Sequence, residues 1–161
     1  MTNNEIIAAT DGSSLANPGP SGWAWYVDEN TWDSGGWDIA TNNIAELTAV
    51  RELLIATRHT DRPILILSDS KYVINSLTKW VYSWKMRKWR KADGKPVLNQ
   101  EIIQEIDSLM ENRNIRMSWV NAHTGHPLNE AADSLARQAA NNFSTRSAHI
   151  PGPGWTERSA K

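Results

Sequence analysis

The sequence predicts an α/β fold in which one mixed β-sheet is flanked by helices. Three strand-like segments precede residue 40, helical and strand spacings alternate after it, and 161 residues suffice for one hydrophobic core but not two. Consecutive strands favour an antiparallel meander, and strand–helix–strand crossovers then add parallel strands. We therefore expect five strands in one sheet. The folded domain is predicted over residues 1–143, followed by a flexible tail over 144–161, where Ser, Thr, Pro and Gly occur without periodicity.

The first three elements are predicted as strands joined by turns. The apolar run at 6–10 ends at the turn-like sequence 11–14, and the Gly- and Pro-rich segment 17–22 is predicted as a loop. Residues 23–27 and 31–39 have strand composition and are separated by a short polar turn.

Helical spacing begins near residue 42. Apolar and helix-favouring residues recur at i, i+3, i+4 and i+7, namely Glu46, Ala49, Val50 and Leu53. The continuous apolar run 64–67 is typical of a strand buried on both faces. The remaining elements are predicted as helices at about 70–79, 80–88 and 98–111, a strand at 115–120, and a final helix over 128–139 with Pro127 in its first turn.

Composition excludes several classes of protein. The chain has no cysteine, so disulfide scaffolds, thiol catalysis and cysteine-bound metals are excluded. Its apolar runs are far shorter than the roughly 20 residues that a membrane helix needs. The first residues lack the basic start and apolar core of a secretion signal. We therefore expect a cytoplasmic protein with no membrane association.

A basic, aromatic segment lies at residues 79–95. The whole chain has a net charge of −1, yet this window holds seven basic residues and one acidic residue. Trp80 and Trp84 share one helix face, which Lys88 continues. A helix with buried tryptophans and solvated lysines would give the same spacing. The single sign of the charge favours nucleic-acid binding, because cations bind phosphates and indoles stack on sugars or bases.

Carboxylates occupy the ends of predicted strands. Asp11 follows the first strand, Asp69 follows the buried run near 64–68, and Glu46 opens the first long helix. Ligands of open α/β sheets bind outside the carboxyl ends of strands. Like charges gathered there are costly unless a divalent cation neutralises them. Asp133 could complete a set of four, and oxygen ligands suit magnesium or manganese.

Each carboxylate also has a local explanation, which the sequence leaves open. These are a capping box of Asn43 with Glu46, an N-cap at Asp69, a turn at Asp11, and an i,i+4 ion pair of Asp133 with Arg137. His123 lies in the loop before the last helix and suits proton transfer near neutral pH. Zinc lacks matching ligands, and we interpret His126 as structural.

Six motifs occur in one order along the chain. They are Asp11-Gly12-Ser13, Asn17-Pro18-Gly19-Pro20, Thr41-Asn42-Asn43-Ile44-Ala45-Glu46, Ser68-Asp69-Ser70, Trp80-x3-Trp84-Lys85 and His123-x-Gly125-His126-x2-Asn129-Glu130-x2-Asp133. Together they resemble bacterial type 1 ribonuclease H over about residues 5–142. The resemblance implies a five-stranded mixed sheet and hydrolysis of the RNA strand in RNA–DNA hybrids.

The resemblance also implies the site. Its metal-binding carboxylates match Asp11, Glu46, Asp69 and Asp133, and its mobile histidine matches His123. Two Mg²⁺ ions, with Mn²⁺ as a substitute, would then act on the bound hybrid and leave 5′-phosphate and 3′-hydroxyl ends.

Substrate contacts follow in the same way. RNA-strand positions match Asn17, Asn42, Asn43 and Glu46, DNA-phosphate positions match Thr41 and Asn99, and the basic segment that grips the DNA strand holds Trp80, Trp84, Lys85 and Lys88. We expect a monomer whose partner is the hybrid, with weak sequence preference because these contacts address the backbone. The alternative is a non-catalytic hybrid-binding module of the same fold.

Overall fold

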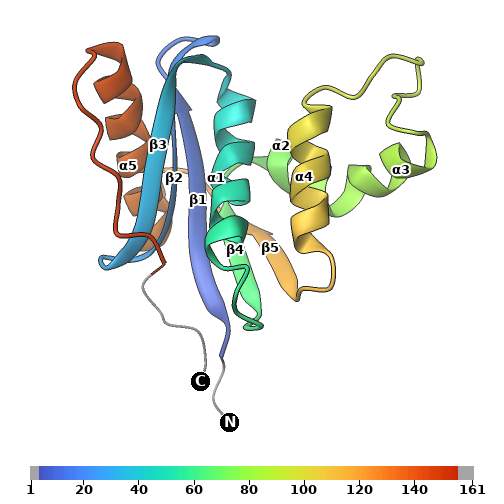
Figure 1. Cartoon of the computed structure of the whole chain (residues 1–161), viewed down its shortest axis with the longest axis horizontal. Helices are drawn as coiled ribbons and strands as arrows, with labels where there is room; N and C mark the ends of the chain where they lie inside the picture. Colours follow the sequence, from blue (N-terminus) through green and yellow to red (C-terminus); the bar gives the residue numbers. More distant parts are fainter. Residues whose placement is uncertain (1–3, 156–161) are drawn as a thin grey trace.

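The computed structural model describes residues 4–155. Its five strands form one sheet in the order β3-β2-β1-β4-β5 (Figure 1). The strands are β1 (Ile6–Ser14), β2 (Gly19–Asp28), β3 (Thr31–Ala40), β4 (Ile64–Ser68) and β5 (Ile115–Trp119). β1, β2 and β3 pair antiparallel, β4 lies parallel to β1, and β5 lies parallel to β4. The predicted mixed sheet is confirmed.

Helices cover both faces of the sheet. They are α1 (Asn42–Ala56), α2 (Lys71–Asn75), the π-helical turn η1 (Ser76–Trp80), α3 (Val81–Met86), α4 (Gln100–Met110) and α5 (Pro127–Ser144). α1 packs on β1 and β2 with α4 beside it, whereas α5 crosses β1, β2 and β3 on the other side (Figure 1). Within residues 4–155, no helix is long and apolar enough to cross a membrane.

The core explains why β4 is apolar from Ile64 to Leu67. Ile64 and Ile66 belong to a buried cluster with Leu53 of α1, whereas Leu67 packs with Ala132 of α5. Successive side chains of a strand point to opposite faces, so a central strand covered on both sides has only apolar residues.

The first hairpin is longer than the sequence suggests. β1 runs on to Ser14, so Asp11 lies inside the strand, opposite Ala24, and not in a turn. Residues 19–22, predicted as a loop, begin β2. Glycine and proline mark turns by local preference, but here pairing with β1 and β3 extends the strand through them.

The predicted helices at 70–79 and 80–88 are one continuous path. α2 passes into η1 and then α3 without a break, and α3 ends at Met86. Lys88 and Trp89 have φ values of 54° and 64°, in the left-handed region, which stops the helix. A π turn adds a residue to the helical repeat, so spacing counted at 3.6 residues could not reveal it.

The flexible tail predicted from residue 144 differs from the structure over residues 144–155. α5 includes Ser144, and the C-terminal segment that follows it (residues 145–155) contacts the outer edge of β3 over residues 149–154. Its backbone amides donate from Gly152 to the Asp33 carboxylate (3.0 Å) and from Gly154 to the Trp32 carbonyl (2.9 Å). Trp155 packs against the main core. The rest of the predicted tail, 156–161, lies outside the described residues.

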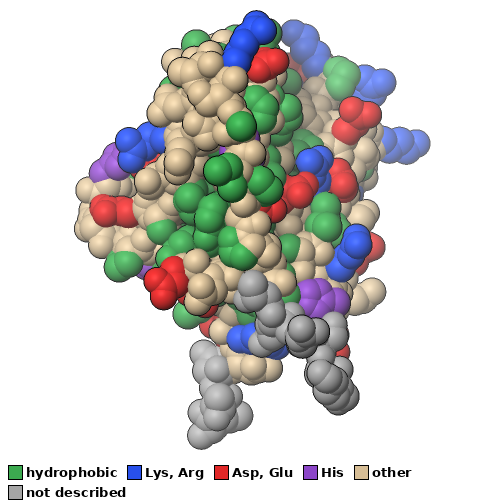
Figure 2. Space-filling model, turned by 60° about the vertical axis from the view of Figure 1, so that its left-hand side comes forward, with side chains coloured by type: hydrophobic (Ala, Val, Ile, Leu, Met, Phe, Trp, Pro, Cys, Tyr) green, Lys and Arg blue, Asp and Glu red, His purple; other side chains and the backbone are tan. Residues whose placement is uncertain are grey.

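Figure 2 shows the side of the molecule to which this segment belongs. Hydrophobic side chains spread over the middle of that face, and most Lys and Arg side chains stand at its margins (Figure 2). Because the C-terminal segment pairs with β3, it covers the open edge of that strand. Unpaired backbone groups at this edge would otherwise be available to another strand.

Candidate active site

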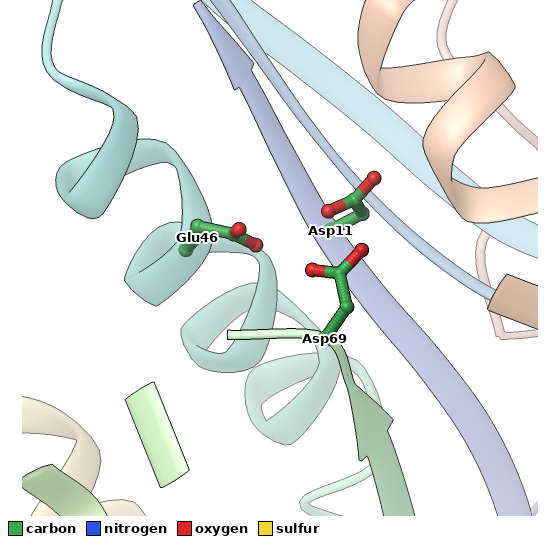
Figure 3. A group of neighbouring side chains, drawn as sticks. All are labelled: Asp11, Glu46 and Asp69. Atoms are coloured by element: carbon green, nitrogen blue, oxygen red, sulfur yellow. The ribbon is translucent and has the colours of Figure 1, made fainter. Parts of the chain in front are cut away.

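Three elements bring Asp11, Glu46 and Asp69 together (Figure 3). Asp11 belongs to β1, Asp69 follows β4, and Glu46 lies in the second turn of α1. One carboxylate oxygen of each lies within 4.8 Å of the others. β1 and β4 are neighbouring parallel strands, which places the two aspartates side by side. Gly12 lets α1 come close, because a Cβ there would lie 2.6 Å from the carbonyl carbon of Ala45.

Local explanations fail for these three carboxylates. Thr41 is the N-cap of α1 and accepts a backbone amide of the first turn at 3.2 Å, so Glu46 does not belong to a capping box with Asn43. Ser70, not Asp69, caps α2, again at 3.2 Å. Asp11, as shown above, lies within a strand. The cluster is therefore a product of tertiary structure.

Burial and mutual repulsion hold protons on the cluster. Burial, followed by the charges of Glu46 and Asp69, raises the pKa of Asp11 from 3.8 to about 10. Burial and the charge of Asp69 raise the pKa of Glu46 from 4.5 to about 8. Burial and the charge of Asp133 raise the pKa of Asp69, against the opposing effects of His123 and a hydrogen bond from Asn129. A cation placed among these groups would reverse the shifts.

The donor set fits a hard divalent cation. The carboxylate of Glu46 accepts a hydrogen bond from the Gly12 amide, yet its Oε1 is buried without a hydrogen-bond partner among residues 4–155. A buried carboxylate oxygen without a partner is unfavourable unless a ligand completes it. Carboxylate oxygens are the ligands that Mg²⁺ and Mn²⁺ prefer.

Asp133 lies at the margin of the cluster. Its Oδ2 accepts from Nε and a terminal nitrogen of Arg137 at 3.1 and 3.0 Å, so the predicted i,i+4 ion pair is present. Asp133 also hydrogen-bonds to the Asp11 carboxyl and raises the pKa of Asp11 and Asp69. The fourth predicted carboxylate is therefore shared between Arg137 and the cluster.

Two further side chains hold Asp69, and sequence analysis gave neither of them a role. Asn129 is buried on α5 and hydrogen-bonds to the Asp69 side chain. Its spacing of four residues from Asp133 places both on one helix face, and this spacing could have identified it. The indole nitrogen of Trp119 donates to the Asp69 carbonyl at 3.2 Å, a contact across strands that no local pattern reveals.

The predicted RNA-strand residues gather at the start of α1. The Asn17 side-chain oxygen accepts from the Asn42 amide at 3.1 Å, which joins the β1–β2 loop to the helix. Thr41, Asn42 and Asn43 form the N-cap and first turn, next to Glu46. These polar groups therefore line one side of the carboxylate cluster.

The basic segment forms a protrusion beside the sheet, around α3 (Figure 1). Ring centroids of Trp80, Trp84 and Trp89 follow one another at 6.0 and 6.3 Å, and Tyr72 adjoins Trp80 at 6.4 Å. The Asn99 amide nitrogen donates to the Tyr72 hydroxyl at 3.0 Å, so this predicted phosphate contact is held by the same aromatic row.

The two predicted lysines differ in setting. Lys85 forms an ion pair with Asp107 of α4 at 2.6 Å, and a hydrogen bond to that carboxylate raises its pKa. Lys88 is exposed and lies beyond the end of α3. Lys85 thus fastens the protrusion to α4, whereas Lys88 is presented to solvent.

An open α/β sheet that gathers carboxylates from two adjacent parallel strands, beside a basic aromatic protrusion, is an arrangement suited to hydrolysis of nucleic acid with divalent cations. The RNase H family model matches residues 3–141. Ribonuclease HI of Streptomyces coelicolor (strain ATCC BAA-471 / A3(2) / M145) is 45% identical in an alignment of 141 residues that covers 83% of this chain and 61% of that protein. Ribonuclease H of Maricaulis maris (strain MCS10) is 41% identical in an alignment of 136 residues that covers 83% of this chain and 91% of that protein.

A solved structure supports the same fold. LC11-RNase H1 in complex with an RNA/DNA hybrid superposes with a TM-score of 0.61 at 22% identity, covering 84% of this chain and 96% of that one. The chain belongs to the RNase H family.

Proposed function

We propose that this chain is an endonuclease that hydrolyses the RNA strand of RNA–DNA hybrids and leaves 5′-phosphate and 3′-hydroxyl ends. The observation that carries the proposal is that Oε1 of Glu46 is buried without a hydrogen-bond partner among residues 4–155, in a side chain clustered with two further carboxylates. Asp11, Glu46 and Asp69 would hold Mg²⁺, and Asp133 would join them when substrate and a second ion are bound. Membership of the RNase H family supports this assignment.

The chain's own residues have separate tasks at this site. Bound divalent cations would supply Lewis acidity at the scissile phosphate and at the attacking water. Asp11 and Glu46, held rigidly in the core, fix the position of the charge, while Asn129 orients Asp69. His123 lies near enough to Asp69 to lower the pKa of the Asp69 carboxyl. At this position the His123 imidazole would take up or release a proton during the reaction.

Substrate selection follows from the two sides of the cluster. Asn17, Asn42 and Asn43 would recognise the 2′-hydroxyl groups that separate RNA from DNA. Thr41 and Asn99 would hold a phosphate of the DNA strand, and the aromatic protrusion would lie against its sugars. The hybrid bound to LC11-RNase H1 supports this choice of ligand.

Cleavage of a labelled RNA–DNA hybrid tests the proposal. The chain and Asp69→Asn are compared in Mg²⁺, in Mn²⁺ and after chelation, with duplex DNA, duplex RNA and single-stranded RNA as comparison substrates. An Asp38→Asn variant, at an exposed aspartate of β3, controls for loss of a charge. We expect cleavage of the hybrid alone, lost in Asp69→Asn and on chelation. Binding without cleavage in either metal would identify the non-catalytic module instead.

We also propose that the protein acts as a monomer in the cytoplasm. The C-terminal segment covers the edge of β3, which disfavours pairing between copies through that strand. Sedimentation of the whole chain at micromolar concentration, and fractionation of cells that produce it, test these two statements.

A further inference from the structure

The loop that carries His123 is held by hydrogen bonds. The loop (residues 120–126) joins β5 to α5, and most of its residues are exposed. His123 and Gly125 have φ values of 60° and 88°, both in the left-handed region. The Thr124 hydroxyl donates to the Asn121 carbonyl at 2.7 Å, and the Gly125 amide donates to Oε2 of Glu130 at 3.0 Å.

Glu130 is well placed to hold this loop from outside it. Its backbone amide donates to the His126 carbonyl at 2.9 Å, so its position is fixed by the first turn of α5. Its side chain reaches back five residues to Gly125. α5 also carries Asn129 and Asp133, so Glu130 links the loop to the helix that contacts the carboxylate cluster.

The conformation of His123 needs such support. A residue other than glycine is sterically disfavoured in the left-handed region, and an exposed loop has little packing to offset this. Without an acceptor at Glu130, the loop would relax, and His123 would leave the neighbourhood of Asp69.

We propose that Glu130 is a positioning residue, whose carboxylate holds the Gly125 amide and thereby keeps His123 turned toward Asp69. This inference rests on the proposed function for its effect on turnover, but the contact itself can be measured without substrate. In this proposal Glu130 acts through His123, since its carboxylate accepts the Gly125 amide of the loop.

The test compares Glu130→Ala with Glu130→Gln, alone and combined with His123→Ala. Glutamine keeps an acceptor oxygen at the same reach, so it should retain most of the turnover. Alanine removes the acceptor, and we expect kcat to fall about threefold to tenfold, the equivalent of one modest hydrogen bond, with KM within about twofold. In the His123→Ala background, Glu130→Ala should cause no further loss, because both changes act through one group.

Hydrogen exchange of the Gly125 amide gives the independent measurement. Exchange should be slow in the parent chain and in Glu130→Gln, and roughly tenfold faster in Glu130→Ala. Glu29→Ala, an exposed glutamate on the β2–β3 turn, should change neither turnover nor this exchange rate.

Additive losses in the double variant would overturn the role of Glu130 through His123, and unchanged Gly125 exchange in Glu130→Ala would overturn the contact. If the parent chain cleaves no hybrid at all, the proposed function fails. The Gly125 exchange data would then still decide whether Glu130 holds the loop.

Discussion

Replacing Asp11 by Asn should stabilise the protein in the absence of divalent cations, although the same change removes a predicted metal ligand. The reason is the raised pKa of the Asp11 carboxyl, about 10 in the folded chain against an ordinary 3.8. A carboxyl whose folded pKa is raised contributes its full stability below pH 4, and this contribution is lost as pH rises toward the folded value. Asparagine has no proton to lose, so the variant escapes this penalty.

The size of the effect follows from the two pKa values. At pH 7 the unfolded chain has an ionised Asp11, whereas the folded chain must keep the carboxyl protonated. The gap between pH 7 and the unfolded pKa of 3.8 is about 3 pH units, which corresponds to at most about 4 kcal/mol of lost stability. At about 2–4 °C per kcal/mol for a chain of this size, Asp11→Asn should raise Tm by roughly 5–15 °C at pH 7.

Thermal unfolding between pH 4 and pH 9, with and without Mg²⁺, measures this directly. The advantage of Asp11→Asn should shrink to a small fraction at pH 4, close to the ordinary pKa of 3.8, because the unfolded carboxyl is then only about half ionised. Mg²⁺ should stabilise the parent more than the variant. An ion adds stability only to the folded state that binds it, and the variant lacks one predicted ligand. Asp38→Asn serves as the exposed control and should leave Tm within about 1 °C. A gain that is the same at pH 4 and pH 8, or a loss of stability at pH 8, would refute the electrostatic account.

Three further outcomes are expected. Arg137→Gln should tighten Mg²⁺ binding about twofold to fivefold in a Tm titration, because it frees Asp133 from a cation; weaker binding would mean that Arg137 instead aids ligand geometry. Trp155→Ala should lower stability to denaturant by about 2 kcal/mol with turnover unchanged at 25 °C, since the indole packs partly buried on the core; equal stability would contradict that packing. Lys88→Ala should weaken hybrid binding and lower its salt dependence by about one counterion, and more so than Lys85→Ala, whose ammonium is engaged by α4; equal effects would show that this ion pair opens on binding.

The strands themselves were predictable where each carries its own sequence pattern. The uninterrupted apolar run of β4 indicated burial on both faces, and the structure places Ile66 and Leu67 in separate clusters on opposite faces. Boundaries at 11–14 and 19–22 were not predictable, because glycine and proline preferences are local while hairpin pairing is not.

The order of the C-terminal segment was likewise not predictable from local sequence preferences. Its composition lacks periodicity, so nothing in the sequence indicated contact with β3. The segment is held by separate contacts, such as the Gly152 amide on Asp33 and the half-buried Trp155, which have no repeat to detect. Irregular backbone fixed by tertiary hydrogen bonds is indistinguishable by composition from a free tail.

The candidate site, too, was predictable only in part from the sequence. Strand ends indicated that Asp11 and Asp69 would meet, since parallel neighbours deliver their ends to one edge. Whether each carboxylate has a local role or belongs to a metal site depended on the tertiary structure. Gly12 allows α1 to approach β1 closely, and Thr41 has the capping role that would otherwise explain Glu46.

The unfavourable electrostatics of the cluster argue that its residues are kept together for a ligand. Hydrophobic burial could close this part of the core at lower free energy with uncharged residues. The fold nevertheless places two acidic side chains inside it and leaves Glu46 Oε1 without a partner in the described part of the chain. A divalent cation would reverse the sign of the interaction for the clustered carboxylates at once. The instability expected of the metal-free protein at alkaline pH and its affinity for a hard cation are therefore two consequences of one arrangement, and the Asp11→Asn and Mg²⁺ experiments should change together.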